Sequence, residues 1–422
     1  MATKAGGDLQ PEAVVPDLRR LTLAGGSRVV VTSDLHLRDR PTEASRWAVS
    51  ELLAVLADWQ GPGVLIFAGD LLELWAGERP RAAAAFDAHA EFVDAVAAFA
   101  RADGRSVLYL VGNHDGRTAW DEETIDQAVT RLGCELALAA EIDVEGVDGS
   151  AVRIEHGHST DPANRFEDPR DPYASPLGQH IVQEFLPTFS QVQGDLLDGV
   201  ETLADPRTFP AFISSRIFYR KAARESLWLL VPVALVLLLR IPLAYAFWNG
   251  DLERLRPFSR VLFIADLVVI VNILVGGLIL VLLVRRTWKT ASSVVAEQRG
   301  GEQNDNTRAA ALAYVAKGYA GLVCGHTHHA ELSPVGSGFY ANTGSGTKVI
   351  DRVDTHFGFP PAFLPRLQVS WVTLLAGTSP AWSVTLTQGR RALPGARVFE
   401  RAMARRRDRD LPGDPVQTGS YP

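Results

Sequence analysis

The chain has 422 residues, of which 47% are hydrophobic and 22% are charged, and its formal net charge at pH 7 is -7. This composition is typical of a folded globular protein that is longer than one average domain, and it excludes a disordered or low-complexity chain. The 49 acidic residues nearly balance the 42 basic ones, so there is no basic excess that would indicate nucleic acid, and no nucleic-acid partner is expected.

The N-terminal arm, residues 1–25, mixes Gly, Pro and charged residues and lacks the apolar segment of a secretory signal. The chain has two cysteines, Cys134 and Cys324, too few for a disulfide framework. Both features fit a reducing compartment. We therefore expect the first half of the chain to stay in the cytoplasm.

Residues 26–160 are predicted to form the first part of an α/β domain. Helical spacing of apolar residues occurs over 43–59 and 81–101. Short runs rich in β-branched and aliphatic residues precede, separate and follow them, at 28–32, 64–67, 106–110 and 151–154. This alternation is the rhythm of an α/β fold, in which functional side chains usually follow the strands.

Residues 161–225 are predicted to be an inserted helical cap, because the sequence becomes rich in Pro, Asp and Phe, with an amphipathic helix at 177–185. Two apolar stretches follow within 226–286, at 227–248 and 261–284. Each is near the ~20 residues that cross a hydrocarbon core about 30 Å thick. A pair of buried core helices is the alternative, but few polar residues surround either helix, which favours a transmembrane hairpin.

Positive charge on both outer flanks of the hairpin predicts its orientation. Basic residues precede the first span and follow the second, namely Arg216, Arg220, Lys221, Arg224, Arg285, Arg286 and Lys289. This arrangement predicts an integral protein of the cell membrane whose catalytic domain is cytoplasmic. Arg240 and Asp266 interrupt the spans; they either pair with each other or extend separately to the outer interface.

Residues 287–388 are predicted to complete the domain that the hairpin interrupts. A helix is expected at 309–317, with strands at 321–324, 367–375 and 382–386. The tail, residues 389–422, contains Arg405, Arg406, Arg407 and Arg409 and is predicted to be disordered.

Five short motifs concentrate side chains that bind divalent metals. They are Asp34-Leu35-His36, Gly69-Asp70, Gly112-Asn113-His114-Asp115, His156-Gly157-His158 and Gly325-His326-Thr327-His328. Any one of them has an ordinary explanation as a turn or a strand end. Together, in this order and after strand-like runs, they indicate a metal site built from carboxylate, amide and imidazole groups.

The five motifs resemble those of the calcineurin-like metallophosphoesterase superfamily, which run D-x-H, G-D, G-N-H-[DE], H-G-[HDT] and G-H-x-H. The resemblance implies a phosphoester or diphosphate hydrolase with an α/β fold, a metallophosphoesterase-type sandwich of two mixed sheets flanked by helices. Here the cap and the two-helix transmembrane hairpin would interrupt that fold. The resemblance also implies two divalent transition-metal ions and a bridging water activated for in-line attack on phosphorus.

Carried over by motif, the first ion would be held by Asp34, His36, Asp70 and His328, and the second by Asp70, Asn113, His156 and His326. His158 is the alternative to His156, although in the family the His before the Gly is usually the ligand. The absence of Cys from the set argues against a soft thiolate site and for manganese, iron or zinc. Manganese is the expected metal, with iron or zinc as alternatives.

His114 resembles the family histidine that lies beside the phosphoryl group and donates a proton or stabilises the transition state. Asp115 is expected to fix the tautomer of His114, with a simple turn residue as the alternative. The remaining histidines outside the motifs, His89, His180 and His356, are expected to be ordinary surface or core residues. His329 is expected to point away from the site.

The stretch from Gly69 to Trp75 resembles that of the pyrophosphatases that cleave UDP-diacylglucosamine in lipid A synthesis. A lipid-linked substrate would also explain a membrane anchor. That family, however, usually has Arg where this chain has His114, and it lacks a hairpin. The cap is then either an acyl-lined approach to the metals or a packing insertion.

Two other functions stay open on the sequence. One is a phosphodiesterase of soluble cyclic nucleotides or dinucleotides, which the motif around His114 permits. The other is a catalytically silent membrane scaffold. The complete ligand set argues against the scaffold, because buried carboxylates are costly without a metal.

Overall fold

The protein is described by a computed structural model. The described residues are 15–76, 80–185, 200–202, 208–222, 238, 245, 248–249, 264, 267–278, 281–282, 285–286, 288, 304–393, 398–405 and 411–422.

The strands, in chain order, are β1 (Arg19–Leu23), β2 (Arg28–Thr32), β3 (Gly63–Ala68), β4 (Arg105–Leu110), β5 (Glu135–Ala137), β6 (Ala139–Val144), β7 (Val152–Glu155), β8 (Gly321–Cys324), β9 (Glu331–Val335), β10 (Gly338–Asn342), β11 (Lys348–Val353), β12 (Ala362–Ala376), β13 (Trp382–Ala392) and β14 (Leu411–Tyr421). The α-helices are α1 (Glu43–Ala57), α2 (Ala82–Ala88), α3 (Ala90–Ala100), α4 (Glu122–Leu132), α5 (Leu177–His180), α7 (Phe209–Arg216), α11 (Asp305–Ala316) and α12 (Val398–Met403). Short 3-10 or π turns lie at η1 (Gly116–Ala119), η2 (His158–Thr160), η3 (Ile181–Phe185), η4 (Val200–Thr202), η6 (Ile217–Ala222) and η9 (His356–Gly358).

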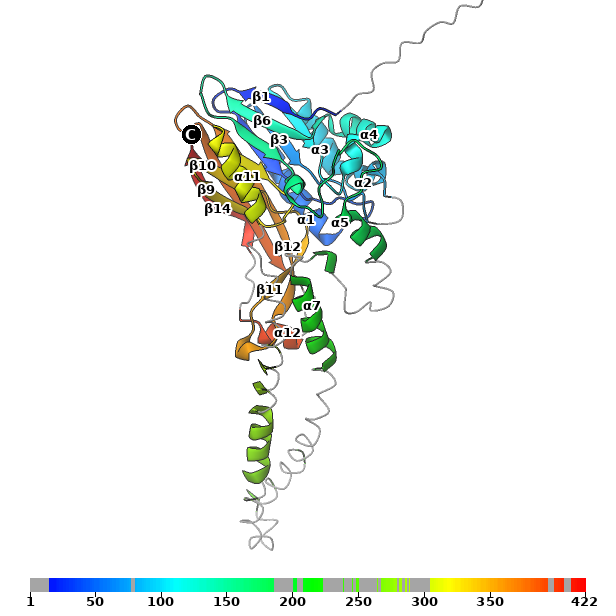
Figure 1. Cartoon of the computed structure of the whole chain (residues 1–422), viewed down its shortest axis with the longest axis vertical. Helices are drawn as coiled ribbons and strands as arrows, with labels where there is room; N and C mark the ends of the chain where they lie inside the picture. Colours follow the sequence, from blue (N-terminus) through cyan, green and yellow to red (C-terminus); the bar gives the residue numbers. More distant parts are fainter. Residues whose placement is uncertain are drawn as a thin grey trace, which may run out of the picture.

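Two mixed sheets form the centre of the domain (Figure 1). One has the strand order β1-β6-β7-β8-β10-β9, and the other has the order β14-β13-β12-β2-β3-β4-β5, with β11 paired to β12. Neighbours β2, β3, β4 and β5 run parallel, whereas β12 is antiparallel to β2. The expected pair of mixed sheets flanked by helices is confirmed.

The sheets pack face to face through one apolar layer. Alternate residues of β3, such as Ile66, contact this layer together with Ile142 of β6 and Val323 of β8, and all three are fully buried. The other face of the same strand, with Phe67, packs against the helices through Phe92 of α3. A strand buried on both faces is expected to be a continuous hydrophobic run, as this one is.

The helical pattern predicted over 81–101 is divided in the structure. His89 adopts φ -121° and ψ 34°, which lies outside helical geometry, and separates α2 from α3. Its side chain is buried, and its carbonyl accepts bonds from the amides of Phe92 and Val93. The break at His89 thus separates two helices whose sequence pattern is continuous.

The described residues of the tail differ from the predicted disorder. Strand β13 continues to Ala392, and β14 pairs with it antiparallel from Leu411 to Tyr421. The ring of Tyr421 lies 4.7 Å from that of Phe339 in the other sheet. The open edge of β13 supplies hydrogen-bond partners for the backbone of β14. The charged composition alone predicted that this backbone would be solvated. Of the arginine run, only Arg405 lies among the described residues, and its amide donates to the carbonyl of Asp354.

The predicted span at 227–248 lies largely outside the described residues, as do Arg240 and Asp266, whereas more than half of the predicted span at 261–284 is described. Within the second span, residues 267–278 form a helix that extends away from the sheets (Figure 1). Its apolar side chains are exposed, with Leu274 at 67% and Leu278 at 58%. In the part of the chain that the structure describes, no helix is both long enough and apolar enough to cross a membrane.

Candidate metal centre

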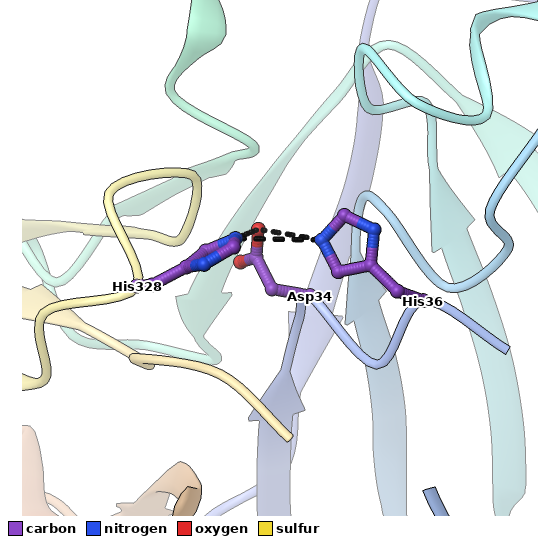
Figure 2. Close-up of side chains that lie close together, drawn as sticks. All are labelled: Asp34, His36 and His328. Carbon is purple, nitrogen blue, oxygen red and sulfur yellow. Dashed lines mark hydrogen bonds and ion pairs between the residues drawn. The ribbon is translucent and has the colours of Figure 1, made fainter. Parts of the chain in front are cut away.

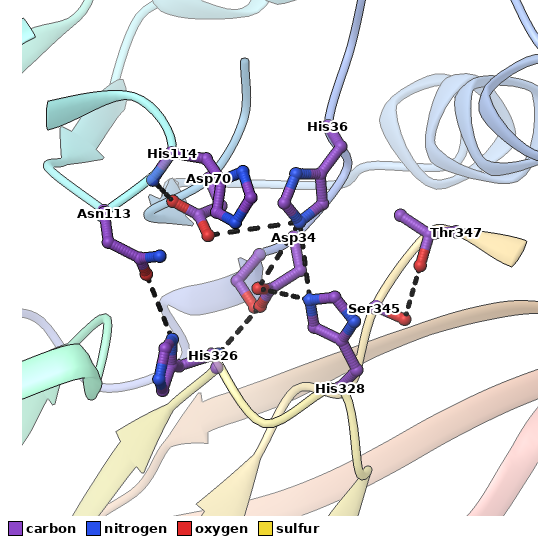
Figure 3. Close-up of polar contacts among 12 residues, drawn as sticks. Asp34, His36, Asp70, Asn113, His114, His326, His328, Ser345 and Thr347 are labelled. Carbon is purple, nitrogen blue, oxygen red and sulfur yellow. Dashed lines mark hydrogen bonds and ion pairs between the residues drawn. The ribbon is translucent and has the colours of Figure 1, made fainter. Parts of the chain in front are cut away.

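The candidate ligands lie in loops that directly follow strands of both sheets (Figure 3). Asp34 and His36 follow β2, Asp70 follows β3, and Asn113 and His114 follow β4. Because these three strands are parallel, their carboxyl ends meet at one edge of the sheet. From the other sheet, β7 and β8 are likewise parallel and lead to His156, His326 and His328. The two sheet edges together bring all of these residues to one place.

Five candidate ligands have left-handed backbone conformations. Their φ angles are 53° at Asp34, 46° at His36, 53° at Asp70, 70° at His326 and 59° at His328. No other non-glycine residue in the described ranges has positive φ. Such conformations cost about 1–3 kcal/mol each and concentrate at functional sites. The surrounding fold therefore holds these side chains in directions that the backbone alone disfavours.

The motif glycines make room for the ligands that follow. A Cβ at Gly112 would lie 2.9 Å from Cγ of Asp70 and closer still to its Oδ1. A Cβ at Gly325 would overlap the side chains of Ser33 and Asp34. These two positions are restricted to glycine because of close approach, since neither has positive φ.

The first group of donors comprises Asp34, His36 and His328 (Figure 2). Nε2 of His328 lies 3.1 Å from Oδ1 of Asp34 and 3.4 Å from Nε2 of His36. Oδ1 of Asp34 is buried and makes no hydrogen bond within the described residues, although two ring nitrogens lie nearby. A buried carboxylate oxygen without a donor, facing imidazole nitrogens, is the arrangement expected of a cation ligand.

The second group lies around Asn113. Its Oδ1 is 2.9 Å from Nε2 of His156 and 3.0 Å from Nδ1 of His326. Asp70 lies between the two groups, because its Oδ2 is 3.1 Å from Nε2 of His156 and 4.0 Å from Nε2 of His36. Asp70 thus occupies the place that a ligand shared by two ions needs.

The two histidines of the fourth motif lie differently. Nδ1 of His156 is 2.8 Å from the carbonyl of Ala68, which directs Nε2 toward Asp70. The ring of His158 instead packs edge-on against Phe166, with centroids 5.7 Å apart. Burial, together with His156 and His326, lowers the pKa of His158 to about 3. The geometry favours His156 as the ligand and leaves His158 beside it.

Carboxylates determine the electrostatics of the site. Burial alone would lower the pKa of His156, but Asp70 and Asp34 outweigh it and raise that pKa to about 10. Burial would raise the pKa of Asp34, yet His328 and His156 lower it to about 2. The carboxylates of Asp34 and Asp70 stay ionised, and the enclosed space favours positive charge.

Glu73 is a site residue that the sequence reasoning did not identify. Its side chain is 4% exposed, and its carboxylate lies 3.0 Å from Nδ1 of His114 and 3.1 Å from Nδ1 of His36. The amides of Trp75 and Ala76 both donate to its Oε1. The signal was present in the sequence: an acidic residue three positions after Asp70, inside an otherwise apolar run.

His114 is held by this carboxylate and by an aromatic ring. Burial would lower its pKa, but Glu73 and Asp70 raise it to about 9. Its amide donates to Oδ1 of Asp70, and the ring of Trp75 lies 4.1 Å from its own. His114 therefore has a fixed orientation beside the metal ligands.

Asp115 does not orient His114 as expected. Its Oδ1 accepts from the amide of Gly112, and its Oδ2 accepts from the hydroxyl of Tyr109 at 2.5 Å. The Asp115 carboxylate therefore braces the loop that carries Asn113 and His114, while Glu73 contacts the ring. Burial and Asp70 raise the pKa of Asp115 to about 7.

His180 and His329, which lie outside the motifs, contact residues that are not candidate ligands. Nδ1 of His180 pairs with Glu184, and the carbonyl of His329 accepts from Asn304. The buried thiol of Cys324 faces the hydroxyl of Tyr340 and does not belong to a donor group. The donors that do converge, carboxylate, amide and imidazole, fit a pair of divalent ions such as manganese, iron or zinc.

Residues 27–205 match the model of the family described as calcineurin-like phosphoesterase. No match to a curated protein was found. Among solved structures, a single mutant of Vps29 from Entamoeba histolytica is 12% identical, with 86% of this chain and 92% of that chain covered and a TM-score of 0.28. The cold-active protein-tyrosine phosphatase of a psychrophile Shewanella species is 19% identical, with 34% and 44% covered and a TM-score of 0.18.

The family match spans the first four of the five motifs and supports the resemblance that they indicate. The similarity to UDP-diacylglucosamine pyrophosphatases stays a prediction.

Proposed function

We propose that this metal-dependent phosphoesterase hydrolyses a phosphoester or diphosphate bond at a pair of divalent ions that share Asp70. The observation that carries the proposal is the convergence of two donor groups on either side of that carboxylate. Asp34, His36 and His328 would complete the ligand set of the first ion. Asn113, His156 and His326 would complete that of the second ion. When bound, the ions would supply Lewis acidity toward the phosphoryl group and activate water for attack. Manganese is the proposed metal.

His114 is proposed to donate a proton to the leaving oxygen. Glu73 and Asp70 raise the pKa of His114 and so favour the protonated ring, which is the state that a general acid needs. Glu73 holds Nδ1, so that Nε2 is left to face the substrate. Trp75 covers the ring and limits its rotation.

A membrane anchor is part of the proposal. It is supported by the exposed apolar side chains of helix 267–278, since soluble proteins rarely expose contiguous apolar surface on this scale. The basic flanks, which include Arg285 and Arg286, favour a cytoplasmic catalytic domain. A substrate linked to lipid would then reach the site from the adjacent bilayer.

One observation favours a second candidate, a phosphodiesterase of soluble cyclic nucleotides. His114 stands where the lipid pyrophosphatases usually have Arg, and its geometry beside Glu73 suits proton donation to any alkoxide leaving group. A catalytically silent scaffold is disfavoured, because it would not need strained backbone at five ligands.

The test is hydrolysis by the purified full chain, reconstituted in lipid nanodiscs with Mn²⁺, of lipid diphosphates, phospholipids and soluble cyclic nucleotides. Asp70→Asn should abolish turnover of every substrate. Preference for the lipid diphosphates would support the lipid-linked proposal, and turnover of soluble esters alone would reject it. Absence of metal-dependent turnover throughout the panel would contradict the proposed activity.

A further inference from the structure

The predicted insertion, residues 161–225, begins with a contact to the candidate metal centre. Asp161 follows η2 directly, and its Oδ2 lies 3.0 Å from Nε2 of His326. The other ring nitrogen of His326, Nδ1, lies 3.0 Å from Oδ1 of Asn113. An imidazole can direct one nitrogen to a metal only if the other carries the proton, and a carboxylate acceptor at Nε2 selects that tautomer.

The carboxylate of Asp161 is itself held in place. Its Oδ1 accepts from the amide of Ala163 at 2.9 Å, and its Oδ2 accepts from Nδ2 of Asn164 at 2.7 Å. These bonds close a turn of the insertion around the carboxylate. The orientation of the Asp161 carboxylate is thus fixed independently of its contact with His326.

The same turn reaches the rest of the insertion. The amide of Gly178 in α5 donates to the carbonyl of Ala163 at 2.8 Å. A Cβ at Gly178 would lie 3.1 Å from Cγ of Asn164, so the helix approaches the turn as closely as a glycine permits. Phe166 of the same segment packs against Gly116, just after the loop that carries His114.

We propose that Asp161 is a positioning residue, which orients His326 for the second metal ion and couples the inserted segment to metal binding. The inference rests on the proposed dinuclear site and extends it. Nothing in the five motifs assigns a role to this position. Coupling between two sites is reciprocal. Contacts that hold the insertion in place therefore raise the affinity for the second ion, and binding of that ion in turn stabilises the turn at Asp161.

The test is a calorimetric Mn²⁺ titration of the full chain after removal of metal. Asp161→Ala should weaken one of the two binding steps about 10- to 100-fold, as loss of such outer hydrogen bonds does, and leave the other step unchanged. Asp161→Asn should weaken it less, because its amide oxygen still accepts from Nε2 of His326. Raising Mn²⁺ should restore kcat of the Ala variant, as expected of a defect in metal binding alone.

Asn306→Ala provides the matched control. Its Nδ2 donates to the carbonyl of Thr160 at 3.2 Å, so it tethers the same end of the insertion without contacting a ligand. This variant should bind both ions as the parent does. An equal loss of Mn²⁺ affinity in Asn306→Ala and Asp161→Ala would mean that any weakened attachment of the insertion has this effect. That result would overturn the proposal.

Unchanged Mn²⁺ affinity in Asp161→Ala would overturn it as well. Thermal unfolding in EDTA verifies folding of each variant, and Asp161→Asn, which keeps the shape of the side chain, provides the reading if the Ala variant unfolds. Failure here is distinct from failure of the proposed activity. If the unmodified chain binds two ions but hydrolyses no substrate, the proposed activity fails and the role of Asp161 stands. If the unmodified chain is active and Asp161→Ala binds Mn²⁺ equally well, only the role of Asp161 fails.

Discussion

Replacing Glu73 with Gln should impair catalysis and shift its pH dependence. Glu73 is the principal source of the raised pKa of His114, and it also holds the ring of the candidate ligand His36. Glutamine keeps the shape of the side chain and removes its charge. The expected result is a loss of kcat of about 10- to 100-fold, in line with other groups that orient catalytic residues.

The magnitude follows from the structure. The pKa of His114 is raised from 6.5 to about 9. At about 1.4 kcal/mol per pH unit, this corresponds to about 3 kcal/mol favouring the charged ring, which is the net amount by which Glu73, Asp70 and Asp34 outweigh the opposing effect of burial. Removing the share of Glu73, the largest of the three, should lower the pKa by about 1 to 2 pH units.

The sign of the effect on rate is fixed by the role of His114. A general acid acts when protonated, so activity is present below its pKa and is lost as pH rises through it. The alkaline limb of the kcat profile should therefore move to lower pH in Glu73→Gln. Bound ions change both absolute values, but the direction persists because the variant and the parent hold the same ions.

The assay is a kcat and kcat/KM profile from pH 5 to 10 at saturating Mn²⁺, with Glu91→Gln on the exposed face of α3 as the control. The control should match the parent at every pH. An alkaline limb that stays in place in Glu73→Gln, with equal metal content, would refute the assignment of His114 and Glu73 as an acid and its partner.

Four further outcomes follow from the structure. Gly112→Ala should lose at least one Mn²⁺ per chain in a stoichiometry measurement, because the added Cβ meets Asp70; full occupancy would contradict the packing argument. Removing metal with EDTA should lower Tm, since an ion at 100 times its Kd contributes about 2.7 kcal/mol, and an unchanged Tm would argue against ions at the core of the site. Deleting residues 411–422 should lower Tm in EDTA by about 2–4 °C per kcal/mol lost, because β14 pairs along β13; a disordered tail would leave Tm unaltered. Trp382→Phe should cost about 1–3 kcal/mol in urea unfolding without changing Mn²⁺ affinity, because its buried Nε1 donates to the carbonyl of Ser150 at 2.6 Å.

The elements with strong local patterns were predictable from the sequence. Strand β2 begins and ends where the β-branched run does, and α1 follows its apolar spacing from Glu43. The fully buried strands were the clearest, because a strand covered on both faces is apolar at every position. The site ligands were predictable for another reason: metal chemistry restricts residue types, so their motifs remain visible without any structure.

What the sequence did not predict depends on long-range partners. Strand β14 has a polar, proline-containing sequence and forms because β13 presents a free edge. Glu73 lies in an apolar run and becomes a site residue only because β4 brings His114 to it. Asp115 was assigned to the wrong partner for the same reason, since the hydroxyl of Tyr109 competes for its carboxylate. Adjacency in sequence is a poor guide to which buried groups bond.

The central claim is that Asp70 is shared by two divalent ions. The most direct measurement is anomalous X-ray diffraction, at the manganese edge, from crystals of the full chain grown with Mn²⁺. We expect two peaks, one beside Asp34, His36 and His328 and the other beside Asn113, His156 and His326, with the Asp70 carboxylate between them. A single peak, or two peaks that Asp70 does not contact, would contradict the account.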